Sequence, residues 1–90
     1  MITLVANTTT KLLKGEPRLR YIKVASDSTT NTRLANKDTG LEMASLGYAI
    51  TNAESVIVEL PPNVELFARS TGTPNLSWAE VVNPTNAIKL

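Results

Sequence analysis

The sequence predicts an all-β protein, either a small antiparallel β-sandwich or a jelly-roll-like barrel. Short runs rich in valine, isoleucine and threonine recur about every ten residues, and clusters of glycine, proline, asparagine and serine separate them. Patterns with a helical period are scarce. At 90 residues and 42% hydrophobic composition, the chain has the size of one domain and too much apolar material for a disordered segment.

The first two β-type runs precede a turn. They cover residues 2–6 and, after a break, residues 8–13. The turn occupies residues 14–17, because Gly15 tolerates the bend and Pro17 has no N–H for a central ladder. Strands are therefore expected on the N-terminal side of this turn.

Residues 18–25 form the next expected strand, and alternation with a period of two divides its side chains between two faces. Residues 26–31 follow as a polar loop, and residues 32–36 as a short strand. The core face of the first of these strands carries Ile22 and Val24 with Arg18 and Arg20 at its edge, and the opposite face carries Tyr21 and Lys23.

Residues 38–47 are ambiguous. Thr39 and Glu42 have the spacing of a capping box, and Gly47 is suited to a helix C-terminus. These signals allow at most one short helical turn near residues 40–46. Apolar residues in the same segment also alternate, as they do in an irregular strand.

Two strands are expected within residues 54–72, and Pro61 and Pro62 form the corner between them. Residues 48–50 precede them as a short strand. The core face of the two strands carries Val56, Val58, Leu60, Val64, Leu66 and Ala68, and the opposite face carries Ile57, Glu59, Glu65, Phe67 and Arg69.

The last expected strand covers residues 75–82 and contains Trp78, which we assign to the core or to a subunit interface because of its large apolar surface. Residues 83–90 are expected to form a C-terminal tail that becomes ordered against a partner. Residues 1–82 then make a single β domain, in which residues 1–7 have a second interpretation as an extended N-terminal arm.

Charged residues are unevenly distributed, although the net charge is only +1. Residues 1–37 hold seven basic and two acidic residues, a balance of +5, whereas residues 38–90 hold two basic and six acidic residues, a balance of −4. Two interpretations are open. Either the charged side chains are dispersed over solvated faces, or the molecule has one basic and one acidic edge. Such edges would pack against further copies of the chain or against an acidic surface.

Cysteine and histidine are both absent from the chain. Disulfide bonds, thiolate metal sites and catalysis by a histidine base are therefore excluded. Neither a calcium-loop spacing nor a phosphate-binding glycine loop stands out, so we expect no enzyme, cofactor or metal site. No apolar run approaches the length of a membrane span, and residues 1–6 lack the features of a signal peptide.

The Asp-Thr-Gly tripeptide at residues 38–40 matches the active-site motif of retroviral-type aspartic proteases, which are β-rich homodimers of similar length. That motif follows an apolar strand, whereas Asn36 and Lys37 precede this one. Leu41 stands where a small residue is expected. A turn or a helix cap is favoured over a protease.

A cluster of five basic residues and Tyr21 lies within residues 11–23. Basic side chains contact phosphates and aromatic rings stack on bases, so the cluster is compatible with nucleic-acid binding. Its members alternate over two faces, however, and the sequence pI of about 8.1 is below that of typical nucleic-acid-binding modules. Protein–protein contact is therefore favoured over nucleic acid.

The order of these features resembles small β-sandwich virion proteins of tailed bacteriophages. Those proteins share a threonine-rich first strand, a basic turn before a strand like residues 18–24, and a polar loop. A proline turn then precedes a Leu-Phe-Ala-x-Ser-x-Gly strand, which residues 66–72 match. The resemblance covers about residues 8–82, and residues 36–46 depart from the glycine-rich, aromatic segment usual in the family.

The resemblance implies a cement protein, which decorates a phage capsid and stabilises it by bridging neighbouring capsid subunits. It implies the major capsid protein or another virion protein as partner, a homo-oligomer with a trimer favoured, and a place on the capsid surface after synthesis in the host cytoplasm. The alternative is a tail, neck or fibre component that binds a host surface or another virion protein, and a small nucleic-acid-binding β-barrel is more remote. The expected protein–protein contacts are Lys11, Lys14, Arg18, Arg20, Tyr21, Phe67, Arg69 and Trp78.

Overall fold

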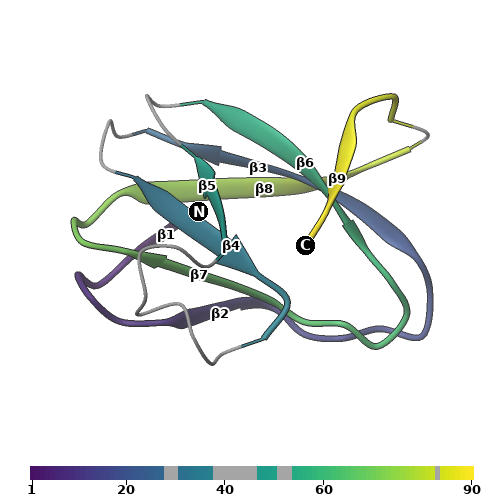
Figure 1. Cartoon of the computed structure of the whole chain (residues 1–90), viewed down its shortest axis with the longest axis horizontal. Helices are drawn as coiled ribbons and strands as arrows, with labels where there is room; N and C mark the ends of the chain where they lie inside the picture. The colour runs from purple at the N-terminus through teal and green to yellow at the C-terminus, as the bar shows by residue number, and fades with distance from the viewer. Residues whose placement is uncertain (28–30, 38–46, 51–53, 83) are drawn as a thin grey trace.

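The two predicted β layers are present. In the computed structural model, all regular secondary structure among the described residues is β-strand. The strands form two packed sheets (Figure 1). The fold class is therefore confirmed as a small β-sandwich. The helical turn expected near residues 40–46 and the Asp-Thr-Gly tripeptide lie outside the described residues, which are 1–27, 31–37, 47–50, 54–82 and 84–90.

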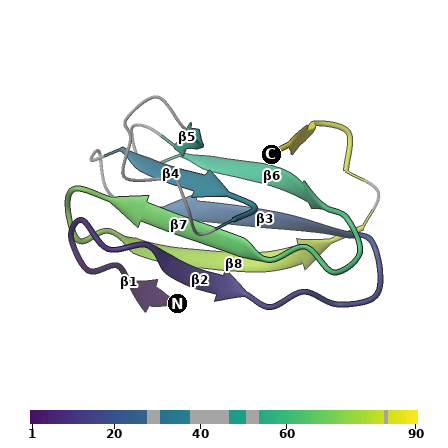
Figure 2. The same ribbon diagram turned by 60° about the horizontal axis from the view of Figure 1, so that its bottom comes forward.

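The described strands divide into a five-stranded sheet, called sheet A here, with the order β1-β8-β3-β6-β9, and a four-stranded sheet B with the order β2-β7-β4-β5. Figure 2 shows sheet B in front of sheet A. Neighbouring strands are antiparallel except β6 and β9, which are parallel. Sheet A consists of β1 (Ile2–Thr3), β8 (Asn75–Val81), β3 (Arg20–Ser26), β6 (Ser55–Leu60) and β9 (Ala87–Lys89), and sheet B of β2 (Thr10–Leu13), β7 (Leu66–Ser70), β4 (Thr32–Ala35) and β5 (Tyr48–Ile50).

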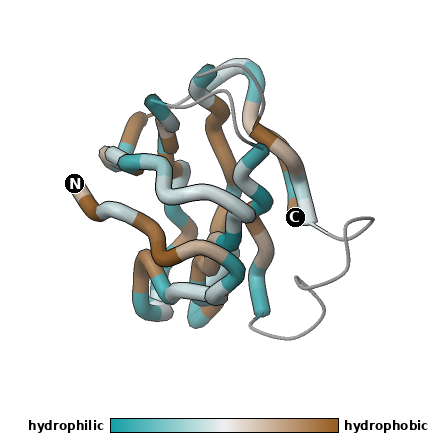
Figure 3. The backbone as a smooth tube through the Cα atoms, turned by 90° about the vertical axis from the view of Figure 1, so that its left-hand side faces the viewer, coloured by the Kyte–Doolittle hydropathy of each residue, from teal (hydrophilic) through white to brown (hydrophobic). Residues whose placement is uncertain are grey.

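Both ends of the chain belong to sheet A. At the N-terminus this agrees with the β-type run expected within residues 2–6 and not with an extended arm, and at the C-terminus a strand is present where a tail was expected. Ile2 and Thr3 pair with Leu76 and Asn75 of β8. At the other edge of the sheet, β9 pairs with residues 57–59 of β6. The two termini therefore lie on opposite sides of the molecule (Figure 3). A strand of three residues next to a proline-containing turn shows no clear alternation, so the sequence gives no periodic signal for β9.

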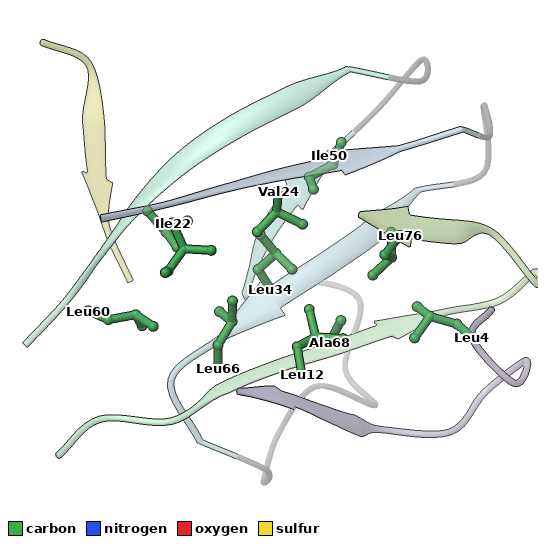
Figure 4. Packing of buried hydrophobic residues seen from close by; sticks show 11 residues of the cluster. Leu4, Leu12, Ile22, Val24, Leu34, Ile50, Leu60, Leu66, Ala68 and Leu76 are labelled. Carbon is green, nitrogen blue, oxygen red and sulfur yellow. The ribbon is translucent and has the colours of Figure 1, made fainter. Parts of the chain in front are cut away.

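The core fills the space between the sheets, and the predicted alternation places its side chains. Val24 of β3 and Val58 of β6 are fully buried and so are Leu66 and Ala68 of β7. Each such valine or leucine contributes about 1.5–3 kcal/mol through burial. Side chains from both sheets point toward one another (Figure 4). The buried cluster comprises Leu4, Leu12, Ile22, Val24, Leu34, Ile50, Val58, Leu60, Leu66, Ala68 and Leu76.

Two turns pack together at one end of the sandwich, those after β2 and after β6. The N–H of Asn63 donates a hydrogen bond of 2.7 Å to the carbonyl of Glu16. Asn63 has a φ of 64°, in the left-handed region that asparagine tolerates. A Cβ on Gly15 would lie 2.8 Å from the carbonyl carbon and oxygen of Asn63, so this close approach of two backbones requires glycine.

Candidate interaction surface

The basic residues near the N-terminal turn pair with acids of the same chain. Arg18 binds both carboxylate oxygens of Glu80 through Nη1 and Nη2, at 2.6 and 2.7 Å, and its Nε lies 3.2 Å from Glu16. Lys11 pairs with Glu65 at 2.7 Å. Because Glu65 and Glu80 come from the acidic half of the sequence, folding mixes the two halves. The hypothesis of separate basic and acidic edges is therefore wrong for these residues.

These contacts shift the ionisation of Arg18 and Glu80 in opposite directions. The hydrogen bonds from Arg18 hold the pKa of the Glu80 carboxyl below its usual range, and the same contact raises the pKa of the Arg18 guanidinium. Both side chains stay exposed to solvent, at 51% for Arg18 and 42% for Glu80. The pair is therefore a surface contact whose charges compensate each other.

Arg20 is buried at the same end of the sandwich, with only 2% of its side chain exposed. Its Nη2 donates to the carbonyls of Lys14 at 2.9 Å and Val64 at 3.4 Å, and its Nη1 lies 3.6 Å from Glu16. Its Nε is buried with no hydrogen-bond partner. Arg20 therefore holds two turns together. The expectation that it contacts a partner protein is wrong, because its side chain is only 2% exposed.

Phe67 is also withdrawn from solvent, at 7% exposure, although it points away from the core as expected. The Lys11 Nζ lies 5.9 Å from the centre of its ring, in a cation–π contact. The neighbouring Arg69 donates to Thr9 Oγ1 at 3.2 Å. Of the expected contact residues, Lys11, Lys14 and Arg18 are exposed, Tyr21, Arg69 and Trp78 are half-buried, and Arg20 and Phe67 are buried.

The outer face of sheet A gathers the alternate side chains of β8, β3 and β6. Of the four residues beside Tyr21 and Lys23 across the sheet only Ala79 is short, whereas both neighbours of Ala25 are serines. No described residue forms an ion pair with Lys23, whereas Lys89 lies 4.0 Å from Glu59. Across the sheet, Tyr21 lies between Val81 and Glu59, Lys23 between Ala79 and Ile57, and Ala25 between Ser77 and Ser55.

A cavity of about 310 Å³ lies beside this face, near the open edges of the two sheets. Tyr48 reaches it from β5 of sheet B, and Ile88 from β9 of sheet A. The sequence did not indicate this cavity, because its walls come from four strands and the loop before β9. Its lining residues are Lys23, Tyr48, Ser55, Val56, Ile57, Asn86 and Ile88.

The last feature of the surface is a free edge on β8. Strand β1 pairs with only Asn75 and Leu76, so residues 77–81 have no partner strand on that side in the part of the chain that the structure describes (Figure 2). On the other side, their register with β3 is continuous. We call residues 77–81 the β8 free edge.

Hydrogen bonds show which backbone groups point toward this edge. The N–H of Leu4 donates to the carbonyl of Pro74 on the β1 side, at 2.9 Å. On the opposite side, Asp27 accepts from the Asn75 N–H at 2.9 Å and donates its own N–H to the Asn75 carbonyl at 3.2 Å. Because successive residues of a strand alternate, Trp78 and Glu80 direct their N–H and C=O groups outward at the β8 free edge.

The contact between Asp27 and Asn75 also fixes the end of β8. Asn75 Nδ2 donates to Asp27 at 2.7 Å, and the Thr3 hydroxyl donates to Asn75 Oδ1. The hydrogen bonds from the Asn75 side chain and backbone N–H lower the pKa of the Asp27 carboxyl. Three strands of sheet A are thereby joined at this end.

No helix among the described residues has the length and apolar character needed to cross a membrane. Within those same residues, no three acidic side chains cluster closely enough to hold a metal ion. Comparisons with protein-family models, curated proteins and solved structures gave no match to this chain.

Proposed function

We propose that this protein decorates a phage capsid and stabilises it by bridging neighbouring capsid subunits. The proposal rests on the resemblance of residues 8–82 to small β-sandwich virion proteins. The structural observation that supports it is the outer face of sheet A, over which no described element packs. A bridging protein needs a broad surface of this kind more than it needs a deep pocket.

The side chains of this face suit a protein partner. Tyrosine is enriched at interfaces because its ring is apolar and its hydroxyl forms hydrogen bonds, so Tyr21 is the expected anchor. Short side chains such as Ala25 and Ala79 let a neighbouring surface approach the sheet closely. Lys23 adds a positive charge that favours an acidic patch on the capsid subunit.

Co-sedimentation with capsids built from the major capsid protein of the same virus tests the proposal. The wild-type protein should sediment with the capsids and raise their melting temperature. The double variant Tyr21→Ala, Lys23→Glu should bind at least about tenfold more weakly, the loss expected when an interface anchor is truncated.

Lys37→Glu is the matched control, because it makes the same charge change at an exposed position following β4 in sheet B. It should bind capsids like the wild type. If the wild-type protein neither sediments with capsids nor changes their thermal stability, the capsid proposal is wrong.

A second candidate is a tail, neck or fibre component, and the cavity beside Lys23 and Tyr48 favours it. A recess with an ammonium group and a phenol could receive a polar group of a host surface or of another virion protein. Electron microscopy of labelled virions separates the two candidates. Many copies spread over the shell would support the capsid role, whereas a few copies at the tail would support the alternative.

A further inference from the structure

We propose that two copies of this protein pair along the β8 free edge, antiparallel, about a twofold axis that passes midway between the Ala79 residues of the two copies. The five-stranded sheets of the two copies would then join into one continuous sheet. The pairing concerns the isolated protein and does not depend on the capsid proposal.

The β8 free edge lacks the features that usually prevent strands from pairing. Natural proteins protect exposed edges with lysine, proline, bulges or very short strands. Residues 77–81, with the sequence Ser-Trp-Ala-Glu-Val, contain neither lysine nor proline. Their register with β3 has no bulge. Their one charge, on Glu80, is compensated by Arg18.

The backbone of this edge is complementary to itself. Ala79 is the central residue, and Trp78 and Glu80 on either side of it direct donors and acceptors outward. In an antiparallel pair centred on Ala79, Trp78 of each copy lies opposite Glu80 of the other. Each such pair exchanges two hydrogen bonds. Ala79 then faces its own copy at a position without hydrogen bonds, where strands approach most closely and a methyl group fits.

The side chains around the edge fit a second copy as well. Trp78 is half-buried, so part of its indole stays in solvent. In the proposed pair it lies opposite Glu80 of the second copy, whose carboxylate is bound by Arg18. An indole beside a guanidinium is a favourable cation–π arrangement.

Exposed apolar side chains lie at both ends of the edge. Val82, 84% exposed, directly follows β8, and Met1, 89% exposed, directly precedes β1. In the proposed pair, the end of β8 in one copy meets the start of β1 in the other. The two most exposed large hydrophobic side chains of the described residues are thereby brought close together. This match favours a second copy over an unrelated strand.

Cysteine cross-linking tests the register directly, because the chain contains no cysteine. At an antiparallel position without hydrogen bonds, the Cα atoms are about 4.5 Å apart, within the range that a disulfide bridges. Ala79→Cys should therefore form a covalent dimer under mild oxidation. Lys37→Cys, at an exposed position just after β4 of sheet B, should remain largely monomeric under the same conditions.

Sedimentation tests the pairing without a cross-link. The wild-type protein at micromolar concentration should have twice the 9.7 kDa mass of one chain. Glu80→Pro removes an outward N–H that the fold itself does not use, so this variant should become a monomer with an unchanged β-type circular dichroism spectrum. Glu80→Ala also loses the contact with Arg18 but keeps the N–H, and it should remain a dimer.

The proposal is overturned if the wild type sediments as a monomer or as the trimer that the family resemblance implies. It is also overturned if Ala79→Cys cross-links no faster than Lys37→Cys. Binding to capsids is measured separately, so either result leaves the capsid proposal to its own test.

Discussion

Arg18 and Glu80, which are 62 positions apart in the sequence, form a two-point ion pair between the start of β3 and the end of β8. The pair is exposed, and exposed ion pairs add little to stability. Its consequence is electrostatic. It neutralises the only charged side chain of the β8 free edge, which leaves that edge able to approach another strand.

Acid should destabilise the fold through Asp27 and Glu80. Both carboxyl groups have a pKa below the ordinary values of 3.8 and 4.5, so the folded state holds their protons more weakly than the unfolded state does. The stability that they contribute is present above the ordinary values and is lost as the pH falls through the lower folded-state values. The melting temperature should therefore decrease below about pH 4.5.

A double variant, Asp27→Asn with Glu80→Gln, isolates this effect. Thermal melts across the acid range should show a shallower pH dependence for the variant than for the wild type. If both proteins lose stability with the same slope, other carboxyl groups are responsible and the assignment fails.

Gly15→Ala should destabilise the end of the sandwich. The added methyl would lie 2.8 Å from backbone atoms of Asn63, and neither backbone is free to move because the Asn63 N–H binds the Glu16 carbonyl. Overpacking of this kind costs about 1–3 kcal/mol. Urea unfolding should show that loss. Lys14→Ala, at an exposed position in the same turn, should be close to neutral.

Much of the fold was predictable because most strands are long enough to show alternation. In β3 and β6, the side chains expected in the core are those found there, and Pro61 and Pro62 do separate two strands. The order of strands within each sheet was not predictable. The pairing of β1 with β8, and of β9 with β6, depends on contacts between distant segments that leave no local pattern.

The candidate surface was predicted less well, for a related reason. The sequence shows that Lys11 and Arg18 are charged but not that Glu65 and Glu80 lie beside them. Alternation correctly predicts that the Phe67 side chain points away from the core. It does not predict that this side chain is only 7% exposed. Ala79 was not singled out at all, because the importance of a small residue at an edge appears only once the neighbouring strands are known.

Arg20→Ala should cost about 3 kcal/mol, the loss typical when one partner of a buried polar contact is removed. The truncation would leave the carbonyls of Lys14 and Val64 without their donor and open a cavity between two turns. Arg20→Met fills the space without the hydrogen bonds and should recover part of the loss, since the buried Nε of the arginine is itself unpaired. Urea unfolding of both variants measures the difference. Equal stability of the alanine variant and the wild type would show that the turns do not depend on Arg20.

Trp78→Ala should destabilise the protein less than Leu66→Ala, although tryptophan is the larger side chain. From the sequence, several kcal/mol are expected for a buried tryptophan, but Trp78 is half-buried and lies at the margin of the core. About 2 kcal/mol is therefore expected for Trp78→Ala, against about 3–4 kcal/mol for Leu66, which is fully buried. Val5→Ala, at an exposed position between β1 and β2, serves as the control. Unfolding at several protein concentrations separates fold from assembly, because a contribution to pairing grows with concentration. A larger loss for Trp78→Ala than for Leu66→Ala at low concentration would place the indole in the core of the single chain.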